Sequence, residues 1–216
     1  MHLKRQEVPK TWPIPRKGSV YVVRPNSKLT GGIPILVVLR DMLKIAQNKK
    51  EVKRAIHMRE ILVNGRKITD EKHAVSLFDT ITITPMKKNY VVELSEKKKF
   101  GLKEIPESES HKKISKVLNK KILKGKKVQI NFTDGNNLIS DMKCNVNDSV
   151  VVNMKNKKEE KCLPLKERAK VLVFEGKHTG ENGVVEKINP DHKMVEINSH
   201  GKKINVLIKQ IIVTGE

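Results

Sequence analysis

VNGRKI, Val63 to Ile68, lies at the centre of a segment that runs from Pro34 to Ile83. Asn-Gly between apolar residues is a strong signal for a β-hairpin, because both central positions of a type I′ turn need a positive φ, which Asn and Gly tolerate best. The pattern predicts a hairpin whose tip presents Arg66 and Lys67 to solvent.

Two short helices are predicted before this hairpin. Pro34 suits a first helical position, and apolar residues then recur at helical spacing. These residues are Leu36, Leu39, Leu43 and Ala46. Asn48, with Glu51 three residues later, is typical of a helix N-cap with a variant capping box, so a second helix is expected to begin there.

The second predicted helix has two different faces. Its cations follow the spacing i, i+3, i+4 and i+7, and they are Lys50, Lys53, Arg54 and His57. The apolar residues Val52, Ala55 and Ile56 fall on another side, so one face is basic and the other is apolar.

After the hairpin, SLFDTITI, Ser76 to Ile83, predicts a polar turn and an alternating strand that closes a small sheet. With the paired helices and VNGRKI, this segment resembles the small RNA-binding fold first recognised in the small-subunit ribosomal protein number four. The alternative interpretation is an ordinary domain of two helices and three strands with solvated lysines on its outside.

The composition favours a polyanionic partner. The chain has 216 residues with 45 Lys and Arg against 24 Asp and Glu, a net charge of +21 that is far beyond what solubility requires. Only eight of the cations are Arg, and Lys acts as a point charge suited to phosphates. Aromatic residues make up 3%, so base stacking can occur at few positions, and readout of the shape and backbone of folded RNA is favoured.

Motifs for metal, cofactor or catalytic chemistry are missing from the sequence. Cys144 and Cys162 belong to no CxxC pair, so we expect neither a disulfide framework nor a zinc site, and the seven His are scattered. Neither GxxxxGK[ST] nor GxGxxG after a strand occurs, so no cofactor is expected. Glu107 and Glu109 are interpreted as part of a solvated loop. We therefore expect no catalytic residue and no enzyme activity.

No hydrophobic run of eighteen residues and no signal-peptide pattern occurs, so a soluble cytoplasmic chain is expected.

The first thirty residues are basic and rich in proline, with Glu7 as their one acid. Prolines every few residues oppose a helix, and the apolar content is low, so we predict an extended arm that becomes ordered on RNA. A merely disordered tail is the alternative, against which Trp12 and the run from Val20 to Val23 offer apolar packing. The candidate RNA contacts of the arm are Lys4, Arg5, Lys10, Arg16 and Lys17.

The central part begins with a lysine-rich stretch. From Lys112 to Lys127 there are eight Lys and no acid, and Lys126 is one of them. Both a helix and a strand fit residues 112–124, and the choice stays open. Val128 to Phe132, the turn at Asp134-Gly135, and Leu138-Ile139 predict a second hairpin.

The last fifty residues contain AKVLVFEGKHTGENGVVEKI, Ala169 to Ile188. Three glycines within eight residues allow a tight loop to approach a partner's backbone, with Lys177 and His178 exposed on it. Turn signals at Asn189-Pro190-Asp191 and His200-Gly201, separated by short strands, predict a five-stranded barrel. The loop resembles the KOW motif of ribosomal proteins and transcription-elongation factors.

The order of these parts is more specific than any single motif. A basic arm with HLKR (His2 to Arg5) and PKTW (Pro9 to Trp12), the helix-pair domain, a β domain with a DG hairpin and a terminal KOW barrel resemble the archaeal and eukaryotic-type small-subunit ribosomal protein four family. The end at Glu216, soon after the barrel, favours an archaeal source.

The resemblance implies an α+β chain that is mainly β. Its expected parts are an extended basic N-terminal arm (1–33), a helix-pair and β-hairpin RNA-binding domain (34–95), a central β domain (96–168) and an SH3-like KOW barrel (169–216). It implies a structural constituent of the small subunit that binds small-subunit ribosomal RNA, with neighbouring small-subunit proteins as partners, no membrane and no homo-oligomer. Its RNA-binding residues would be the arm cations with Lys50, Lys53, Arg54, Arg66, Lys67, Lys177 and His178.

Two other classes of function compete with this interpretation. Helix-pair RNA-binding domains also occur beside RNA-modifying enzymes such as pseudouridine synthases, but a catalytic domain needs about 150 residues and only about 120 remain here. A KOW-type factor that binds transiently is the other class, and it would leave the subunit in a high-salt wash.

Overall fold

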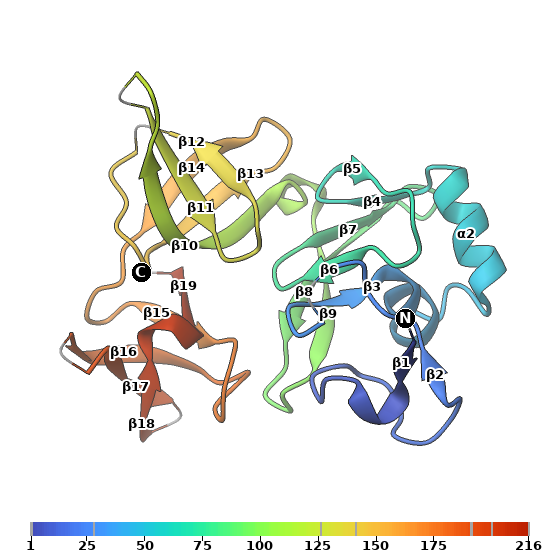
Figure 1. The fold of residues 1–216 in the computed structure, drawn as a ribbon, viewed down its shortest axis with the longest axis horizontal. Helices are drawn as coiled ribbons and strands as arrows, with labels where there is room; N and C mark the ends of the chain where they lie inside the picture. Colours follow the sequence, from blue (N-terminus) through green and yellow to red (C-terminus); the bar gives the residue numbers. More distant parts are fainter. Residues whose placement is uncertain are drawn as a thin grey trace. The chain divides into compact units, whose positions relative to one another are not determined.

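The computed structural model describes residues 2–27, 29–125, 127–140, 142–190, 192–199 and 201–215. Lys126, Asp191 and His200, which carried parts of the predictions above, lie outside these ranges. The chain is mostly β with few helices, and it divides into two compact units, with the boundary between His111 and Lys112 (Figure 1).

The first unit is built on a five-stranded antiparallel sheet in the order β5-β4-β7-β8-β9. These strands are β4 (Ile61–Val63), β5 (Arg66–Lys67), β7 (Thr80–Ile83), β8 (Lys88–Leu94) and β9 (Phe100–Ile105). A two-stranded pair joins β3 (Gly32–Pro34) to β6 (Ala74–Ser76). Residues 96–111 were expected in the central β domain, but β9 pairs with β8, so they belong to the first unit.

The predicted hairpin at VNGRKI is confirmed. Val63 pairs with Arg66, and the two turn residues between them have positive φ, 52° at Asn64 and 71° at Gly65. The backbone N–H of Thr80 donates to Oδ1 of Asn64 at 3.0 Å, and Nδ2 of Asn64 donates to Oδ1 of Asp79 at 2.7 Å. The turn residue therefore also fixes the neighbouring strand β7.

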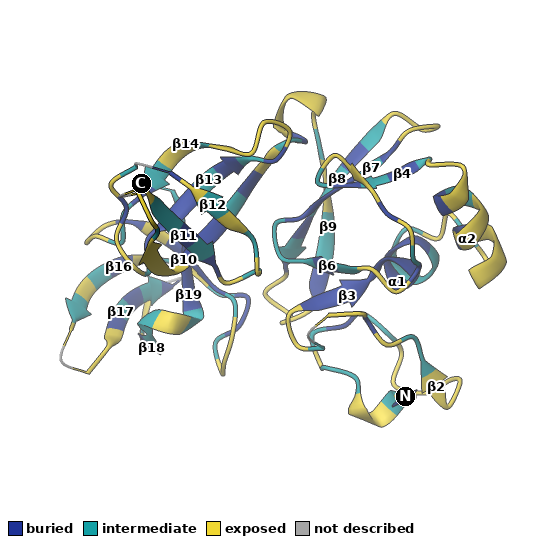
Figure 2. Ribbon diagram, turned by 45° about the horizontal axis from the view of Figure 1, so that its top comes forward, coloured by how far each residue is buried: buried dark blue, intermediate teal, exposed yellow. Residues whose placement is uncertain are grey.

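The second predicted helix, α2 (Lys49–His57), begins where its cap was predicted. Oδ1 of Asn48 accepts from the backbone N–H groups of Lys50 and Glu51, at 2.9 and 3.1 Å. The Glu51 carboxylate accepts from the backbone N–H of Gln47 at 2.7 Å. Side chains on both sides of the helix start therefore bond to backbone N–H groups there, as in a capping box. Figure 2 shows that most of the surface of α2 is exposed, and its buried side chains are Val52 and Ile56.

The first predicted helix is shorter than expected. Pro34 is the extended residue before α1 (Ile35–Val37), which continues as a π-helical turn over Val38–Met42. Lys44 has φ of 55°, which ends the helix before Ala46 is reached. All residues from Ile35 to Leu39 are buried, so this segment is part of the core and is not an amphipathic helix on the surface.

The expectation of an extended N-terminal arm is wrong. Its strand β1 (Leu3–Lys4) pairs with β2 (Tyr21–Val22), and a short 3₁₀ helix (Arg5–Glu7) follows β1. The side chain of Trp12 is only 2% exposed, and the N–H of Phe100 donates to the backbone oxygen of Thr11 at 2.8 Å. Leu3 and Trp12 are thus buried, and their burial closes the arm into a compact loop within the first unit.

The second unit contains two five-stranded antiparallel sheets, in the orders β12-β11-β10-β13-β14 and β18-β17-β16-β15-β19. The first consists of β10 (Lys112–Ile122), β11 (Val128–Phe132), β12 (Asn137–Ile139), β13 (Ser149–Asn153) and β14 (Lys158–Leu163). The second consists of β15 (Lys170–Val173), β16 (Asn182–Asn189), β17 (Met194–Ser199), β18 (Lys202–Leu207) and β19 (Ile211–Gly215). Two further 3₁₀ helices span Glu107–Glu109 and Ile208–Gln210.

The open choice for residues 112–124 is resolved as a strand, because β10 pairs with both β11 and β13. The predicted DG hairpin is confirmed by the pairing of β11 with β12 and by φ of 84° at Gly135. The two sheets meet where the Oγ of Ser149 accepts from the N–H of Val213 at 2.9 Å.

Candidate nucleic-acid interface

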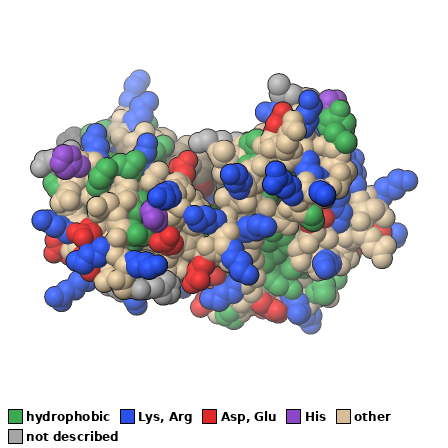
Figure 3. Space-filling view, turned by 90° about the horizontal axis from the view of Figure 1, so that it is seen from below, with side chains coloured by type: hydrophobic (Ala, Val, Ile, Leu, Met, Phe, Trp, Pro, Cys, Tyr) green, Lys and Arg blue, Asp and Glu red, His purple; other side chains and the backbone are tan. Residues whose placement is uncertain are grey.

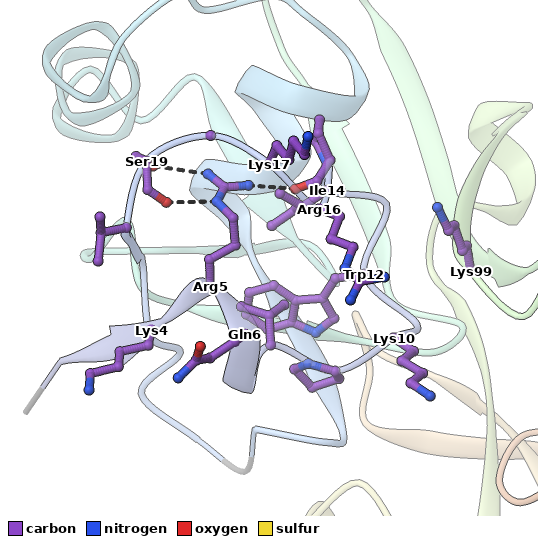
Figure 4. A pocket seen from close by; sticks show the side chains of 15 residues that line it. Lys4, Arg5, Gln6, Lys10, Trp12, Ile14, Arg16, Lys17, Ser19 and Lys99 are labelled. Carbon is purple, nitrogen blue, oxygen red and sulfur yellow. Dashed lines mark hydrogen bonds between the residues drawn. The ribbon is translucent and has the colours of Figure 1, made fainter.

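The folded arm brings all five of its predicted contact residues around one cavity of about 930 Å³ (Figure 4). Lys4, Lys10, Arg16 and Lys17 are exposed at this site, and Arg5 is half-buried. Lys99, from the turn between β8 and β9, also lines the cavity. Sequence reasoning missed Lys99, although it lies in a run of three lysines, because nothing local relates that turn to the arm.

Arg5 is committed to the arm itself. Its Nε donates to the backbone oxygen of Ser19 at 2.7 Å, and its two terminal nitrogens donate to the oxygen of Pro15 at 2.7 Å and to Oγ of Ser19 at 2.9 Å. All three acceptors are neutral, and through these three bonds the guanidinium fixes the loop over residues 15–19.

The predicted RNA-contact residues on α2 differ in whether they lie near a carboxylate of the protein. Lys50 and Arg54 are exposed. Nζ of Lys53 lies 4.0 Å from a carboxylate oxygen of Glu71, which is 6% exposed and which also accepts from Lys49 at 2.8 Å. Lys53 and Lys49 therefore help to hold α2 on the turn that contains Glu71.

A second cavity of about 460 Å³ connects the arm with the start of α2. Its lining includes His2 and Tyr21, whose rings lie 5.1 Å apart, together with Lys49 and Lys72. Arg66 and Lys67, the exposed tip of the β4–β5 hairpin, line neither of the two cavities.

The predicted contacts of the second unit lie in the loop between β15 and β16. Lys177 is exposed, whereas His178 is half-buried and its Nδ1 lies 3.1 Å from Oε1 of Glu181. The hydroxyl of Thr179 donates to the oxygen of Gly176 at 2.6 Å, which tightens the loop. One ring nitrogen of His178 therefore contacts Glu181 within the loop.

The described lysines of the stretch from Lys112 to Lys127 differ in burial. Lys113 is buried and forms an ion pair with Asp134 of the DG turn. Lys116 is also buried, and its ammonium group donates to backbone oxygens of Ile208 and Ile211. Burial lowers the pKa of Lys116 to about 8. The exposed lysines of the stretch, Lys112, Lys120, Lys121, Lys124 and Lys127, remain on the surface.

Lys and Arg side chains spread over the face drawn in Figure 3, with fewer acidic ones among them. Within the described ranges, no group of three His, Cys, Asp or Glu residues could hold a metal ion. No helix in the described part of the chain is long and apolar enough to cross a membrane. Cys144 and Cys162 are free thiols, and burial together with the neighbouring Cys144 raises the pKa of Cys162 to about 12.

Known proteins resemble the chain over most of its length. It is 39% identical over 190 residues to the small ribosomal subunit protein eS4 of Methanocella arvoryzae, a match that covers 87% of this chain and 80% of that protein. Residues 86–159 match the model of ribosomal family S4e, and residues 1–27 match that of the RS4NT domain. The chain belongs to ribosomal family S4e.

Other S4e relatives match the whole chain. The eS4 protein of Archaeoglobus fulgidus is 33% identical over 224 residues, which cover 100% of this chain and 94% of that protein. The fold is also that of a solved S4e structure. The 30S ribosomal protein S4e from Thermoplasma acidophilum superposes with a TM-score of 0.74 at 22% identity and covers 86% of this chain and 96% of its own.

Proposed function

We propose that the chain is a structural constituent of the small ribosomal subunit, in the cytoplasm, and that it binds folded ribosomal RNA through several basic surfaces at once. The observation that carries this proposal is its membership of the S4e family, whose relatives are named as small ribosomal subunit proteins. The net charge of +21 supports a polyphosphate partner. No catalytic step is part of this function.

Three surfaces would share the RNA contacts. The first is the arm, with the cations that line its cavity; the second comprises Lys50, Arg54 and the hairpin tip; the third is the loop with Lys177. Linking weak modules raises the effective concentration of each for its own RNA segment, so tight assembly does not require a single strong site. If about ten phosphates are engaged, the log–log dependence of affinity on salt has a slope of roughly −7 to −9.

The finer division of the chain belongs to the same proposal. We assign residues 34–95 to an RNA-binding domain of the ribosomal-protein-four type and residues 169–216 to a KOW barrel. The capped helix α2, the Asn-Gly turn and the five-stranded sheet β18-β17-β16-β15-β19 support these assignments. Neighbouring small-subunit proteins would be its other partners.

Crosslinking in cells, followed by a high-salt wash and sequencing of the bound RNA, tests the proposal. Reads confined to a few segments of small-subunit ribosomal RNA are expected. Reads spread over transfer or messenger RNA would indicate an RNA-modifying role, and reads lost in the wash would indicate a transient factor. Either result would contradict a resident structural role.

A further inference from the structure

The cavity of the arm combines positive charge with an apolar wall. Six cations line it and none of its lining residues is acidic; the cations are Lys4, Arg5, Lys10, Arg16, Lys17 and Lys99. The one carboxylate of the arm, on Glu7, accepts from the backbone N–H of Lys4 at 3.3 Å and is not part of the lining. The apolar part of the lining is formed by Val8, Pro9, Trp12, Ile14, Pro15 and Val20.

The volume of the cavity is larger than a single small anion needs. Its volume of about 930 Å³ lies within the range of roughly 300 to 1,000 Å³ that is typical of sites for small organic ligands. A phosphate alone would use the cations and leave the apolar wall uncovered. A ligand that carries both an anionic group and a flat, weakly polar group would use both.

The wall contains polar atoms without a partner. The indole of Trp12 is 98% buried, yet its Nε1–H has no hydrogen-bond partner in the described part of the chain, and the same holds for the buried hydroxyl of the adjacent Thr11. A buried Trp N–H usually finds an acceptor, because leaving it unpaired costs free energy. The wall of the cavity therefore lacks a hydrogen-bond acceptor for the indole N–H.

The arm also holds its charges in place before any ligand binds. Arg5 is bonded to Pro15 and Ser19, so the loop that carries Arg16 and Lys17 is fixed at its two ends (Figure 4). Gln6 lines the same cavity with an exposed side-chain amide, which has both donor and acceptor groups. Preorganised charge beside such a group suits a ligand that is recognised by more than its charge.

We propose that this cavity receives one unpaired nucleotide of an RNA strand. In this proposal the phosphate lies against Arg16 and Lys17, and the base lies against the apolar wall that includes Trp12. The side-chain amide of Gln6, which lines the same cavity, hydrogen-bonds to the edge of the base. Unpaired bases of folded RNA are commonly splayed out and held on aromatic or guanidinium surfaces in this way. The inference deepens the proposed function and rests on it, since it places one specific contact within the RNA interface.

Trp12 is the single tryptophan of the chain, so its fluorescence reports on this cavity alone. The full chain is titrated with a fluorescein-labelled single-stranded RNA of ten nucleotides, and the anisotropy of the label is recorded beside the Trp emission of a parallel unlabelled titration. Inorganic phosphate and a ten-residue polyglutamate peptide are titrated separately. We expect the RNA to change the Trp emission with the same midpoint as the anisotropy, and the two other anions to leave it unchanged.

Two double variants sharpen the result. Arg16→Glu with Lys17→Glu is expected to lower the affinity for the ten-nucleotide RNA about tenfold and to abolish the Trp response. Lys202→Glu with Lys209→Glu makes the same charge change at exposed positions of the other unit, and it keeps the Trp response. If the first variant shifts the Trp emission of the free protein, and the arm is therefore disturbed, Arg16→Gln with Lys17→Gln replaces it.

The outcomes separate this inference from the function on which it rests. RNA binding without a Trp response, with equal affinity for both double variants, would overturn the nucleotide site and leave the ribosomal role intact. Failure to bind any RNA would contradict the proposed function itself. A Trp response to phosphate would make the cavity a general anion site, and a response to polyglutamate would make it a site for an acidic protein segment; each overturns the nucleotide site.

Discussion

The ammonium group of Lys116 donates to the backbone oxygen of Ile211 at 2.8 Å and also to the oxygen of Ile208. Lys116 lies on β10, whereas both acceptors lie at the start of β19 and just before it, so a single side chain joins the two sheets of the second unit. The side chain is buried, its acceptors are neutral, and its Nζ lies 5.9 Å from the centre of the Phe174 ring.

This buried charge predicts a specific dependence of stability on pH. Burial lowers the pKa of Lys116 from its ordinary value of 10.5 to about 8. Between these values the unfolded state binds more protons than the folded state, so the contribution of Lys116 to stability rises with pH. One pKa unit corresponds to about 1.4 kcal/mol, and the gain is therefore at most about 3 kcal/mol.

Urea unfolding of the natural chain and of Lys116→Met at pH 7 and pH 10 measures this effect. The difference in unfolding free energy between the two proteins is expected to shift in favour of the natural chain at pH 10. Lys121→Met, on the exposed part of β10, serves as the control and should show the same difference at both pH values. A Lys116→Met difference that is also independent of pH would contradict the assignment.

The side-chain hydrogen bonds of Asn64 are expected to contribute to the unfolding free energy, and this contribution can be separated from backbone strain. Its amide bonds both to the buried carboxylate of Asp79 and to the N–H of Thr80. Asn64→Gly keeps the positive φ but removes both bonds, and should cost about 2 kcal/mol. Asn147→Gly is the matched control, because Asn147 also has positive φ, 74°, while its side chain makes no hydrogen bond within the described part of the chain.

Thermal or urea unfolding distinguishes the two glycine variants. The control is expected to change the unfolding free energy by less than about 0.5 kcal/mol. Equal losses in both variants would mean that the Asn64 amide adds nothing to the link between the hairpin and β7.

Gly183 predicts a packing effect between two strands. A Cβ at Gly183 on β16 would lie 2.5 Å from the backbone oxygen of Asn198 and 2.5 Å from Cγ2 of Ile197, both on β17. Gly183→Ala should therefore lower the unfolding free energy by about 2 to 3 kcal/mol. Gly101→Ala, at a position with no atom within 4 Å of the added Cβ, should be neutral or slightly stabilising in the same unfolding measurement. A neutral Gly183→Ala would show that the two strands can separate without loss.

The same glycine shows where sequence reasoning reached its limit. The glycines of the terminal loop suggested a close approach to a partner, but at Gly183 the close neighbour is β17 of the same chain. The hairpin turn and the cap of α2 were predictable because each depends on residues two to four positions apart. Contacts between distant strands leave no such local pattern.

The lysines of β10 also make contacts with distant residues that no local sequence pattern indicates. The sequence of this stretch, eight lysines without an acid, does not tell which of them are buried: Lys113 pairs with Asp134, and Lys116 bonds to residues more than ninety positions away. In the arm, the frequent prolines correctly excluded an α-helix, but the burial of Leu3 and Trp12 against the first unit decided its compact form. The arm cations were predictable from composition, and their gathering around one cavity with Lys99 was not.

The cations of α2 differ in whether they lie near a buried carboxylate, and this difference gives the last prediction. Lys50 and Arg54 are exposed, whereas Lys53 lies near the buried carboxylate of Glu71. Lys50→Glu with Arg54→Glu should weaken binding to small-subunit ribosomal RNA about tenfold near 0.15 M salt and make the log–log salt slope shallower by about 2, without loss of stability.

Lys53→Glu should instead lower the unfolding free energy by about 1 kcal/mol, because it places a second carboxylate beside Glu71. Filter-binding titrations at several salt concentrations, paired with urea unfolding of each variant, separate the two effects. If Lys50→Glu with Arg54→Glu lowered the urea midpoint as Lys53→Glu does, its loss of RNA affinity would reflect damage to the helix, and α2 would no longer count as a contact surface.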